Sequence, residues 1–544
     1  MSKQAVLSQT VAPVTQRRLE IEKTALPPNL GAFLDNLVEE VPDSVALHLI
    51  ESGEALTYAE LRARVNQVAN GLRHLGVRKG AHIGVMLPNI KEFPIAWLAI
   101  AKVGAVMVPI NIRYTSRELH YVLDDSEADY LIILADLLPL FEEVANTLPR
   151  LPRNNVIVCG ASQEGYGKWD HLTEFGEQFT AEEPVGPNDL LNIQYTSGTT
   201  GFPKGCMLSH DYWLIVSKVN AARDGRCMPN VMASTPFFYM DPQWLMLMAF
   251  HQRGTLFLAP RQSASRFMDW VRQYRINFCL MPNVILKQPE SPLDRDNDLI
   301  KVSIYGFPSA DQAALEARFD VVAREAFGMT EIGSCLFVPI EATDMVGSGT
   351  CGIPSPFREC RIVDGNGNDV PEGDTGELVV RGRGILQGYY RKPDATSEAF
   401  FGEWFRTGDL FTRDENGFYY IVGRVKDMIR RAGENIAARE VEAVVSVMPE
   451  VAEAAAIPVP DDTRGEEVKI YVVPRSGRNA DDLTPERVIA HCAQQLASFK
   501  VPRYVEFRSE LPKTPSDKVA KHLLKAEKTD LRQGSWDRVE GRWL

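Results

Sequence analysis

The sequence predicts an α/β fold: a large N-terminal domain of doubly wound α/β layers with a small β-rich unit, followed by a small α+β C-terminal domain. Three observations support this prediction. Short apolar strands alternate with helical patterns along the N-terminal part, glycine and proline become dense around Gly347, and a charged segment at Lys426 precedes a compact C-terminal region. Strands that alternate with helices are typical of parallel, doubly wound sheets.

The first clear helix is predicted from Thr57, after a loose, flexible arm over residues 1–26. Thr57 and Glu60 have the spacing of a capping box, in which each side chain binds a backbone N–H at the helix start. Gly76 is suited to end this helix. The apolar residues between them lie on one helical face: Leu61, Val65, Val68 and Leu72.

Later elements follow the same alternation. Apolar strands are predicted at residues 83–87, 105–108, 130–134, 233–235, 255–259 and 278–281, and β-rich runs at 359–363, 376–381 and 418–422. The C-terminal region has a helix that includes Val441, Val444, Val445 and Met448, a strand at 468–473 and a final helix at about 484–496. We therefore expect an N-terminal domain over residues 27–425 and a C-terminal domain over residues 426–544.

Composition excludes several classes of protein. The net charge is −13, from 59 basic and 72 acidic residues, which argues against nucleic acid or an anionic membrane as a partner. The eight cysteines include no C-x-x-C pair, and none of the nine histidines belongs to an H-E-x-x-H motif, so no zinc site is expected. Because no signal peptide or membrane span is apparent, we expect a soluble, cytoplasmic protein.

The strongest chemical signal is the segment YTSGTTGFPKG at residues 195–205, which follows an apolar strand. Glycines let the backbone approach a phosphate, while hydroxyls and a lysine supply donors and positive charge. A Walker A loop would need Ser or Thr directly after its lysine. A flexible surface turn would explain the glycines but not the other residues. We expect these to bind the nucleotide: Thr196, Ser197, Gly198, Thr199, Thr200, Gly201 and Lys204.

This segment, together with four later motifs, resembles the adenylate-forming superfamily of acyl-CoA synthetases, luciferases and peptide-synthetase adenylation domains. The motifs occur in the order of that superfamily: FGMTE at 327–331, FRTGDL at 405–410, GRVKDMIRRAGENI at 423–436 and PKTPSDKVAK at 512–521. The resemblance covers residues from about 30 to 525. It implies an acid:CoA ligase that uses ATP, Mg²⁺ and coenzyme A and proceeds through an acyl-adenylate. RRAGEN at 430–435 resembles the crotonobetaine/carnitine-CoA ligase-like branch.

The resemblance also implies roles for individual residues of the FGMTE motif. Glu331 corresponds to the Mg²⁺ ligand, and a carboxylate oxygen suits that ion. Thr330 corresponds to the hydroxyl that contacts the α-phosphate. Phe327 and Gly328 correspond to the segment that lies against the adenine ring.

In the later motifs, Asp409 and Arg424 correspond to the pair that holds the ribose hydroxyls. Lys518 corresponds to the catalytic lysine, a cation suited to the charge that develops when a carboxylate attacks the α-phosphate. Lys426 corresponds to the hinge about which a mobile C-terminal domain rotates between two half-reactions. Gly433 would then line the pantetheine tunnel, although a glycine at this place also suits the end of a turn.

By analogy, the acid pocket is predicted to include the turn at 332–334 and six residues whose side chains are mostly apolar or aromatic. No cation is placed to bind a second carboxylate, so we expect an apolar or cyclic acid. Trp244 also fits the alternative of a helix core. The six residues are Tyr239, Met240, Gln243, Trp244, Gly306 and Phe307.

Three residues depart from the superfamily pattern: Tyr239 replaces histidine, Phe327 replaces tyrosine, and Asp517 replaces glycine beside Lys518. They leave open an enzyme specialised for thioester formation from a supplied acyl-adenylate. A carrier-protein-loading acyl-AMP ligase, a luciferase-type oxygenase and a non-enzymatic nucleotide-binding relative are further alternatives, although the intact charged residues argue against the last. The acid and the assembly, for which a homodimer is one option, are not determined by the sequence.

Overall fold

The computed structural model describes residues 3–161, 163–196, 203–432, 434–475, 483–514 and 518–544. The chain forms two compact units. The first contains the residues up to 196, then 204–359 and 380–403, and the second contains 360–379 and 404–544. Residues 404–425, which the sequence analysis placed before the expected domain boundary, group with the second unit, in which α14 (Ala438–Ser446) contacts β21 (Tyr419–Arg424).

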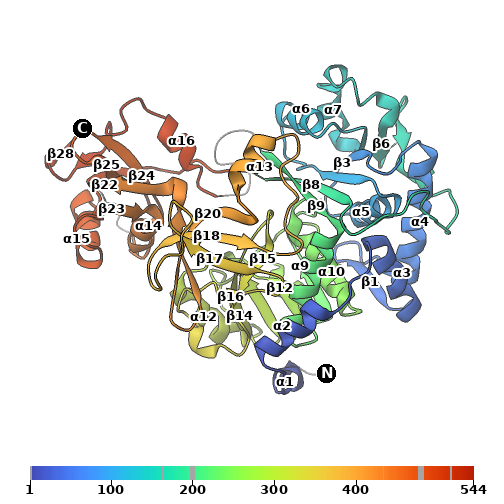
Figure 1. The fold of residues 1–544 in the computed structure, drawn as a ribbon, viewed down its shortest axis with the longest axis horizontal. Coiled ribbons are helices and arrows are strands. Elements are labelled where there is room, and N and C mark those ends of the chain that lie inside the picture. Colours follow the sequence, from blue (N-terminus) through green and yellow to red (C-terminus); the bar gives the residue numbers. More distant parts are fainter. Residues whose placement is uncertain (1–2, 162, 197–202, 433, 476–482, 515–517) are drawn as a thin grey trace. The chain divides into compact units, whose positions relative to one another are not determined.

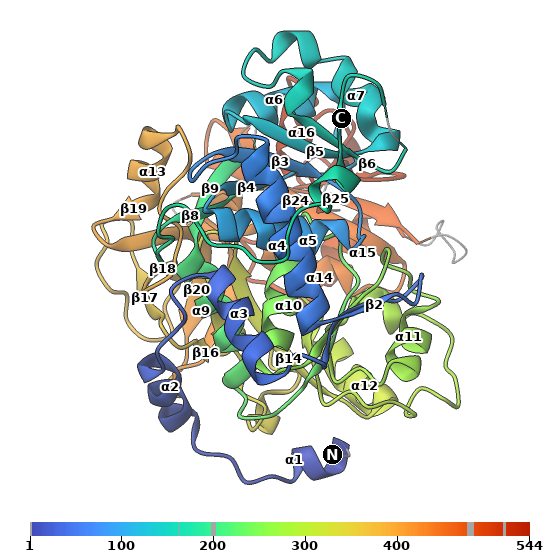
Figure 2. The same cartoon turned by 90° about the vertical axis from the view of Figure 1, so that its right-hand side faces the viewer.

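The segment expected to be a loose arm contains two helices, α1 (Lys3–Leu7) and α2 (Val14–Lys23), and α2 lies on α9 (His210–Ala222) (Figure 2). Arg17 is buried and forms an ion pair with Glu341 at 2.8 Å, and Ile21 joins an apolar cluster with residues of α9. A helix with only two buried side chains, one of them charged, has no apolar periodicity. For this reason the sequence did not indicate it.

One sheet of the first unit has nine strands in the order β16-β15-β14-β13-β12-β10-β11-β1-β2. Its central pairs are parallel, and antiparallel strands stand at both edges. The strands are β1 (Val45–Leu49), β2 (Ala55–Thr57), β10 (Asn230–Ala233), β11 (Thr255–Leu258), β12 (Phe278–Leu280), β13 (Lys301–Ile304), β14 (Val322–Met329), β15 (Gly333–Phe337) and β16 (Ile353–Pro354).

The other sheet of this unit has seven strands in the order β7-β6-β5-β3-β4-β8-β9, and only its β8–β9 pair is antiparallel. The strands are β3 (His82–Met86), β4 (Val106–Pro109), β5 (Tyr130–Leu134), β6 (Val156–Cys159), β7 (Gly167–Lys168), β8 (Leu190–Thr196) and β9 (Lys204–Ser209). Helices α9 and α10 (Met240–His251) are buried on nearly all sides and lie between the two sheets (Figure 1). The predicted doubly wound α/β fold is confirmed.

The predicted capping box is also present. Thr57 accepts the Glu60 amide and Glu60 accepts the Thr57 amide at the start of α4 (Tyr58–His74). The helix ends before Gly76, which has a φ of +95°. Among the described residues, no helix is both long and apolar enough to cross a membrane.

The second unit contains a β-sheet of β17 (Glu359–Val363), β18 (Gly376–Arg381), β20 (Trp404–Arg413) and β21. A further sheet follows in the order β23-β22-β25-β26-β27-β28, with β24 paired to β25. Its strands are β22 (Met428–Arg431), β23 (Glu434–Ala437), β24 (Val451–Asp461), β25 (Gly465–Pro474), β26 (Tyr504–Phe507), β27 (Trp536–Asp537) and β28 (Arg542–Trp543). Helices α14, α15 (Pro485–Gln495) and α16 (Lys521–Ala526) belong to the same unit.

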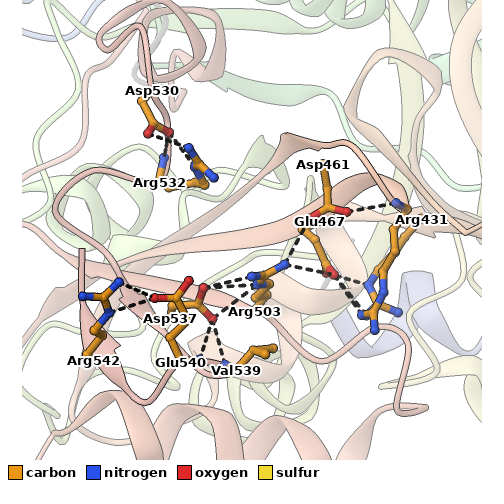
Figure 3. A network of polar contacts seen from close by, with 11 residues as sticks. Arg431, Asp461, Glu467, Arg503, Asp530, Arg532, Asp537, Val539, Glu540 and Arg542 are labelled. Carbon is orange, nitrogen blue, oxygen red and sulfur yellow. Dashed lines mark hydrogen bonds and ion pairs between the residues drawn. The ribbon is translucent and has the colours of Figure 1, made fainter.

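A network of charged side chains connects the strands of the C-terminal sheet (Figure 3). Arg503 contacts Asp537 at 3.1 Å and Asp461 at 3.0 Å, while Arg431 pairs with buried Glu467 at 2.6 Å. Burial raises the pKa of Asp537, but the Arg503 guanidinium and two backbone N–H groups lower it by more, so the net direction is downward. Arg503 thus stabilises a carboxylate that is only 1% exposed.

We predict that Arg503→Met lowers the unfolding temperature at pH 7, because it leaves a buried carboxylate without its cation, a loss of about 3–5 kcal/mol in comparable pairs. A carboxyl group with a depressed folded-state pKa stabilises the fold above its unfolded pKa of about 4, and this contribution is lost as pH falls through the folded-state value. The difference between variant and wild type should therefore shrink below about pH 4, as followed by circular dichroism.

Arg532→Met is the matched control, since Arg532 and its partner Asp530 are both about half exposed. Exposed pairs contribute little, so its unfolding temperature should stay close to that of the wild type. An equal loss in the two variants would contradict the role assigned to Arg503.

Candidate functional site

The predicted phosphate-binding segment lies between two antiparallel strands, β8 and β9, in which Tyr195 is opposite Gly205 and Thr196 is opposite Lys204. Gly205 is required here, because an added Cβ would lie 2.5 Å from the Ile193 side chain. The strands bring Thr196 and Lys204 to the two ends of one connection. Five predicted residues within that connection lie outside the described residues: Ser197, Gly198, Thr199, Thr200 and Gly201.

A buried carboxylate holds the end of β8. The Tyr195 hydroxyl donates to Asp125 Oδ2 at 2.8 Å, and Lys392 Nζ pairs with Asp125 Oδ1 at 2.8 Å. Burial and the Asp125 charge both raise the pKa of Tyr195, so its hydroxyl remains a donor. Sequence reasoning missed Asp125 and Lys392, which stand in segments without a recognised motif.

Lys204 and Glu331 are brought together by Tyr389. Lys204 Nζ lies 4.0 Å from the centre of the Tyr389 ring, and the Tyr389 hydroxyl donates to Glu331 Oε1 at 3.0 Å. Burial and the neighbouring Glu331 carboxylate raise the pKa of Tyr389, which keeps the hydroxyl protonated. The sequence analysis did not predict Tyr389. Its only signal is a tyrosine pair in the polar segment GYYRKPDAT.

The backbone around Glu331 is held in place from three directions. The carbonyls of the turn at 330–332 accept, in order, from the Tyr212 hydroxyl at 2.8 Å, the Leu386 amide at 2.7 Å and the Arg358 guanidinium at 2.8 Å. Gly333 follows with a φ of +63°, and an added Cβ there would lie 2.3 Å from Val216. The turn that carries Thr330 and Glu331 is therefore tightly constrained.

The residues around Glu331 fit a magnesium ion that arrives with a nucleotide. Its side chain gives one oxygen to Tyr389 and has a second oxygen for another partner. Within the described segments, no three His, Cys, Asp or Glu side chains form a metal-binding group. Mg²⁺ usually keeps several waters and takes one or two carboxylates together with substrate phosphates, so a single carboxylate suffices.

The segment predicted to contact the acid adjoins this turn. Thr330 Oγ1 lies 3.7 Å from Met240 Sδ, and the Tyr239 hydroxyl accepts from Asn111 Nδ2 at 3.5 Å. Burial raises the pKa of Tyr239, although the Arg113 charge acts in the opposite direction. Tyr239 therefore supplies a neutral hydroxyl rather than a group that titrates near pH 7.

Gln243 and Trp244 are buried, and their side chains contact other parts of the protein. Gln243 is fully buried, donates to the carbonyls of Phe237 and Tyr239 at 3.0 and 3.2 Å, and accepts from Asn192 at 3.0 Å. Trp244 is buried in α10 and meets Phe278 edge to face. Gln243 thus orders the loop that carries Tyr239, and Trp244 packs as helix core.

The remaining residues predicted to contact the acid or the nucleotide lie near the ends of β13 and β14. Gly306 has a φ of +66° and open space beside its Cα, and its amide donates to Glu325 at 2.9 Å. Phe307 is partly buried against the core of the nine-stranded sheet. Phe327 and Gly328 lie in β14, where an added Cβ on Gly328 would meet the Gly333 carbonyl at 2.5 Å.

Tyr305, next to Gly306, has a side chain that is 47% exposed. Burial and the Asp241 charge raise its pKa, while the Arg223 charge acts in the opposite direction. The sequence analysis did not name Tyr305, although it borders the predicted pocket residues Gly306 and Phe307.

In the second unit, the register of β20 and β21 places Asp409 opposite Arg424. Arg424 Nε donates to Asp409 Oδ1 at 2.9 Å. Burial raises the pKa of Asp409, while Arg424 and Lys518 are among the cations that act against this rise. Asp409 is 1% exposed, and its Oδ2 has no hydrogen-bond partner among the described residues.

Lys426 lies in a short 3₁₀ turn, Val425–Asp427, between β21 and β22. Its carbonyl accepts from Lys525 Nζ at 3.2 Å. Lys518 stands on an exposed loop in which its amide donates to Thr514 Oγ1 at 3.2 Å. Gly433 and Asp517 lie outside the described residues.

Comparison with known proteins gives a consistent result. Residues 34–390 match the family model described as AMP-binding enzyme, and residues 440–518 match the AMP-binding enzyme C-terminal domain. The crotonobetaine/carnitine–CoA ligase of Citrobacter koseri is 32% identical over 521 residues, covering 91% of this chain and 99% of that protein. The Salmonella typhi ligase of the same name is 31% identical over 526 residues, covering 91% and 99%.

Solved structures agree on the fold. ATP-bound MatB from Rhodopseudomonas palustris has a TM-score of 0.83 at 27% identity, covering 92% of this chain and 99% of that one. The anthranilate CoA ligase AuaEII, in complex with anthranoyl-AMP, has a TM-score of 0.82 at 24% identity, covering 93% and 98%. With a family model that matches most of its length, this chain belongs to the family of AMP-binding enzymes.

Proposed function

We propose that this chain is an ATP-dependent acid:CoA ligase that converts a carboxylic acid, ATP and CoA to acyl-CoA, AMP and pyrophosphate through an acyl-adenylate. The contact between Lys204, Tyr389 and Glu331 supports this proposal most directly, because a cation and a carboxylate suited to Mg²⁺ lie on the same tyrosine. Family membership and relatives named CoA ligases favour this activity over a carrier-protein-loading one.

The chemistry of the first half-reaction explains the residue types. A carboxylate oxygen of the acid attacks the α-phosphorus, the bond to the bridging oxygen breaks, and pyrophosphate leaves with the electron pair. Cations must neutralise the anionic groups that meet in this step. Lys204 supplies one charge, Lys518 supplies another, and Thr330 offers a hydroxyl. Mg²⁺, bound by Glu331, would neutralise charge on the phosphate oxygens.

The Asp409–Arg424 pair in the second unit is suited to bind the ribose of the nucleotide. Asp409 Oδ2 is buried without a partner in the described protein, so it carries a desolvation cost that a hydroxyl donor would relieve. Arg424 is held beside it and provides further donors. A ribose with two neighbouring hydroxyls meets both requirements, since each hydroxyl can donate and accept.

The composition of the predicted acid pocket bears on the class of acid. The residues predicted to line it include no cation that could receive a second carboxylate. We therefore propose a monocarboxylic acid with an apolar or cyclic body as the substrate.

The contacts of Lys426 support its assignment as the hinge. Besides the bond from Lys525 to its carbonyl, the adjacent Asp427 is 3.6 Å from Lys521 and 3.9 Å from Lys525. Lys521 also pairs with Glu442 at 2.6 Å. Helix α16, which begins three residues after Lys518, therefore holds the segment that would turn between the two half-reactions.

We predict that a screen of acids with ATP, Mg²⁺ and CoA yields acyl-CoA with monocarboxylic acids and least with dicarboxylic ones, as read by mass spectrometry. Lys518→Ala should lower acid activation, measured by pyrophosphate exchange, by about 10²–10³-fold, because it removes one charge-stabilising group. Thioester formation from a preformed acyl-adenylate should change far less. Equal loss of both steps would contradict the role of Lys518.

We predict that Tyr389→Phe lowers kcat/KM for Mg·ATP in acid activation by about tenfold or more, because a hydrogen bond to a charged group contributes about 1.5–3 kcal/mol. The ring over Lys204 remains, so the variant tests the hydroxyl alone. Tyr390→Phe is the control, since its hydroxyl binds Glu127 instead. Similar kinetics in the two variants would remove Tyr389 from the proposed site.

We predict that Lys521→Met slows the complete reaction by roughly fivefold, the effect of about 1 kcal/mol, while each half-reaction measured alone changes less. The reason is that Lys521 holds the hinge segment rather than the reacting atoms. Arg487→Met on α15, which removes a partly exposed pair with Glu450, serves as the control in the same rapid-mixing experiment. A loss confined to one half-reaction would refute the hinge assignment.

A further inference from the structure

A small cavity lies between α2 and the β15–β16 region of the first unit. Its volume is about 100 Å³. Apolar side chains form most of its wall, with Val14 and Ile21 from α2 and Phe337 and Ile353 from the strands. The lining also includes Thr15, two prolines of the 354–356 segment and the guanidinium groups of Arg18 and Arg223, so a predominantly apolar space also contains positive charge.

Arg223 is the unusual member of this lining. It is 2% exposed, its Nη1 donates to Ser334 Oγ at 2.7 Å, and its guanidinium lies 4.9 Å from the centre of the Phe337 ring. Its Nε is buried and has no hydrogen-bond partner among the described residues. Because this Nε has almost no accessible surface, a ligand in the cavity would bind through the two Nη groups, which make one hydrogen bond within the described chain, to Ser334.

The cations near Arg223 each have a carboxylate partner. Lys301 pairs with Asp224 at 2.6 Å, and Arg17 pairs with Glu341 at 2.8 Å. Asp224 acts on Arg223 from further away, but in the described part of the chain no carboxylate lies within 4.0 Å of Arg223. Arg18 pairs with Glu22 at 3.0 Å. Of these four cations, Arg223 alone has no carboxylate of its own among the described residues, and a buried charge without a partner is costly.

Helix α2 closes this space firmly. Arg17 Nε donates to the Arg223 carbonyl at 2.9 Å, Arg18 donates to the Arg358 carbonyl at 2.9 Å, and the Phe357 amide donates to Glu22 at 2.8 Å. These polar contacts attach α2 to the C-terminal end of α9 and to the segment at 357–358. The cavity is therefore a built feature of the fold and not a gap beneath a loosely attached segment.

We propose that this cavity binds a small monocarboxylate, with its carboxylate on Arg223 and its short apolar tail against α2 and Phe337. Guanidinium and carboxylate groups match in geometry and charge. At about 30 Å³ per water molecule, the volume corresponds to roughly three waters, which fits an acid of about four to six non-hydrogen atoms. The site does not depend on the proposed ligase activity.

The site has a structural connection to the turn that carries Glu331. The same Arg223 that would receive the acid donates to Ser334, the residue after Gly333 in β15. A bound carboxylate would add an acceptor to the guanidinium and hold it more firmly against that strand. Occupancy of the cavity should therefore stabilise the first unit.

The test is isothermal titration of the full-length protein with propionate, with propanol and propylamine as neutral and cationic probes of similar size. We expect saturable binding of propionate only, and a higher unfolding temperature in its presence. Arg223→Met should weaken this binding by at least about tenfold, since a charge-assisted hydrogen bond is lost.

Val14→Phe is a second variant, because it fills the cavity from the partly exposed side of α2 and leaves Arg223 in place. It should also abolish propionate binding while the protein stays folded, as checked by circular dichroism. Gln16→Phe, a substitution at an exposed position of the same helix, is the control and should bind normally. Propionate binding that persists in Val14→Phe, equal binding of propanol, or no saturable binding to the wild type would overturn the proposal.

Discussion

The contact chain from Lys204 through Tyr389 to Glu331 is the constraint on which the chemistry proposed for the first unit depends. A lysine and a carboxylate intended for the same phosphate groups would neutralise each other if they formed a direct ion pair. The Tyr389 ring separates them: its face receives the lysine, and its hydroxyl donates to the carboxylate. Both charges are thereby positioned while each keeps capacity for a ligand.

Much of the surrounding structure serves to hold this arrangement. The turn at 330–332 has all three of its carbonyls occupied, and Gly333 allows β15 to pass close to α9. Gln243 donates a hydrogen bond to the Tyr239 carbonyl and is itself held by Asn192, so the loop that carries Tyr239 is fixed. Rigid support of this kind reduces the reorganisation that a reaction would otherwise require.

In the second unit, strand register rather than a linking side chain positions the charged pair. Asp409 and Arg424 meet because they are opposite each other in one antiparallel register, so their distance is set by the sheet itself. Farther along, the segment that we propose as a hinge is held by lysines of α16. Ionic contacts at partly exposed positions are weak enough to exchange, which is compatible with the proposed change of conformation.

The sequence by itself determined the elements whose signals are local. The capping box at Thr57, the alternation of strands and helices, and the motif positions of Lys204, Glu331 and Asp409 follow from spacing over a few residues. These features made the fold class and the main charged residues of the candidate site predictable.

Only the tertiary structure decided the contacts between distant segments. Tyr389 stands 58 residues from Glu331, and Arg17 stands 324 residues from Glu341. Neither pair leaves a periodic pattern, because each depends on one side chain reaching another across the fold. The structural role of Gln243 and the burial of α2 were hidden for the same reason: a local pattern records which face of an element is apolar, whereas the partner of a polar group is set by how the elements pack.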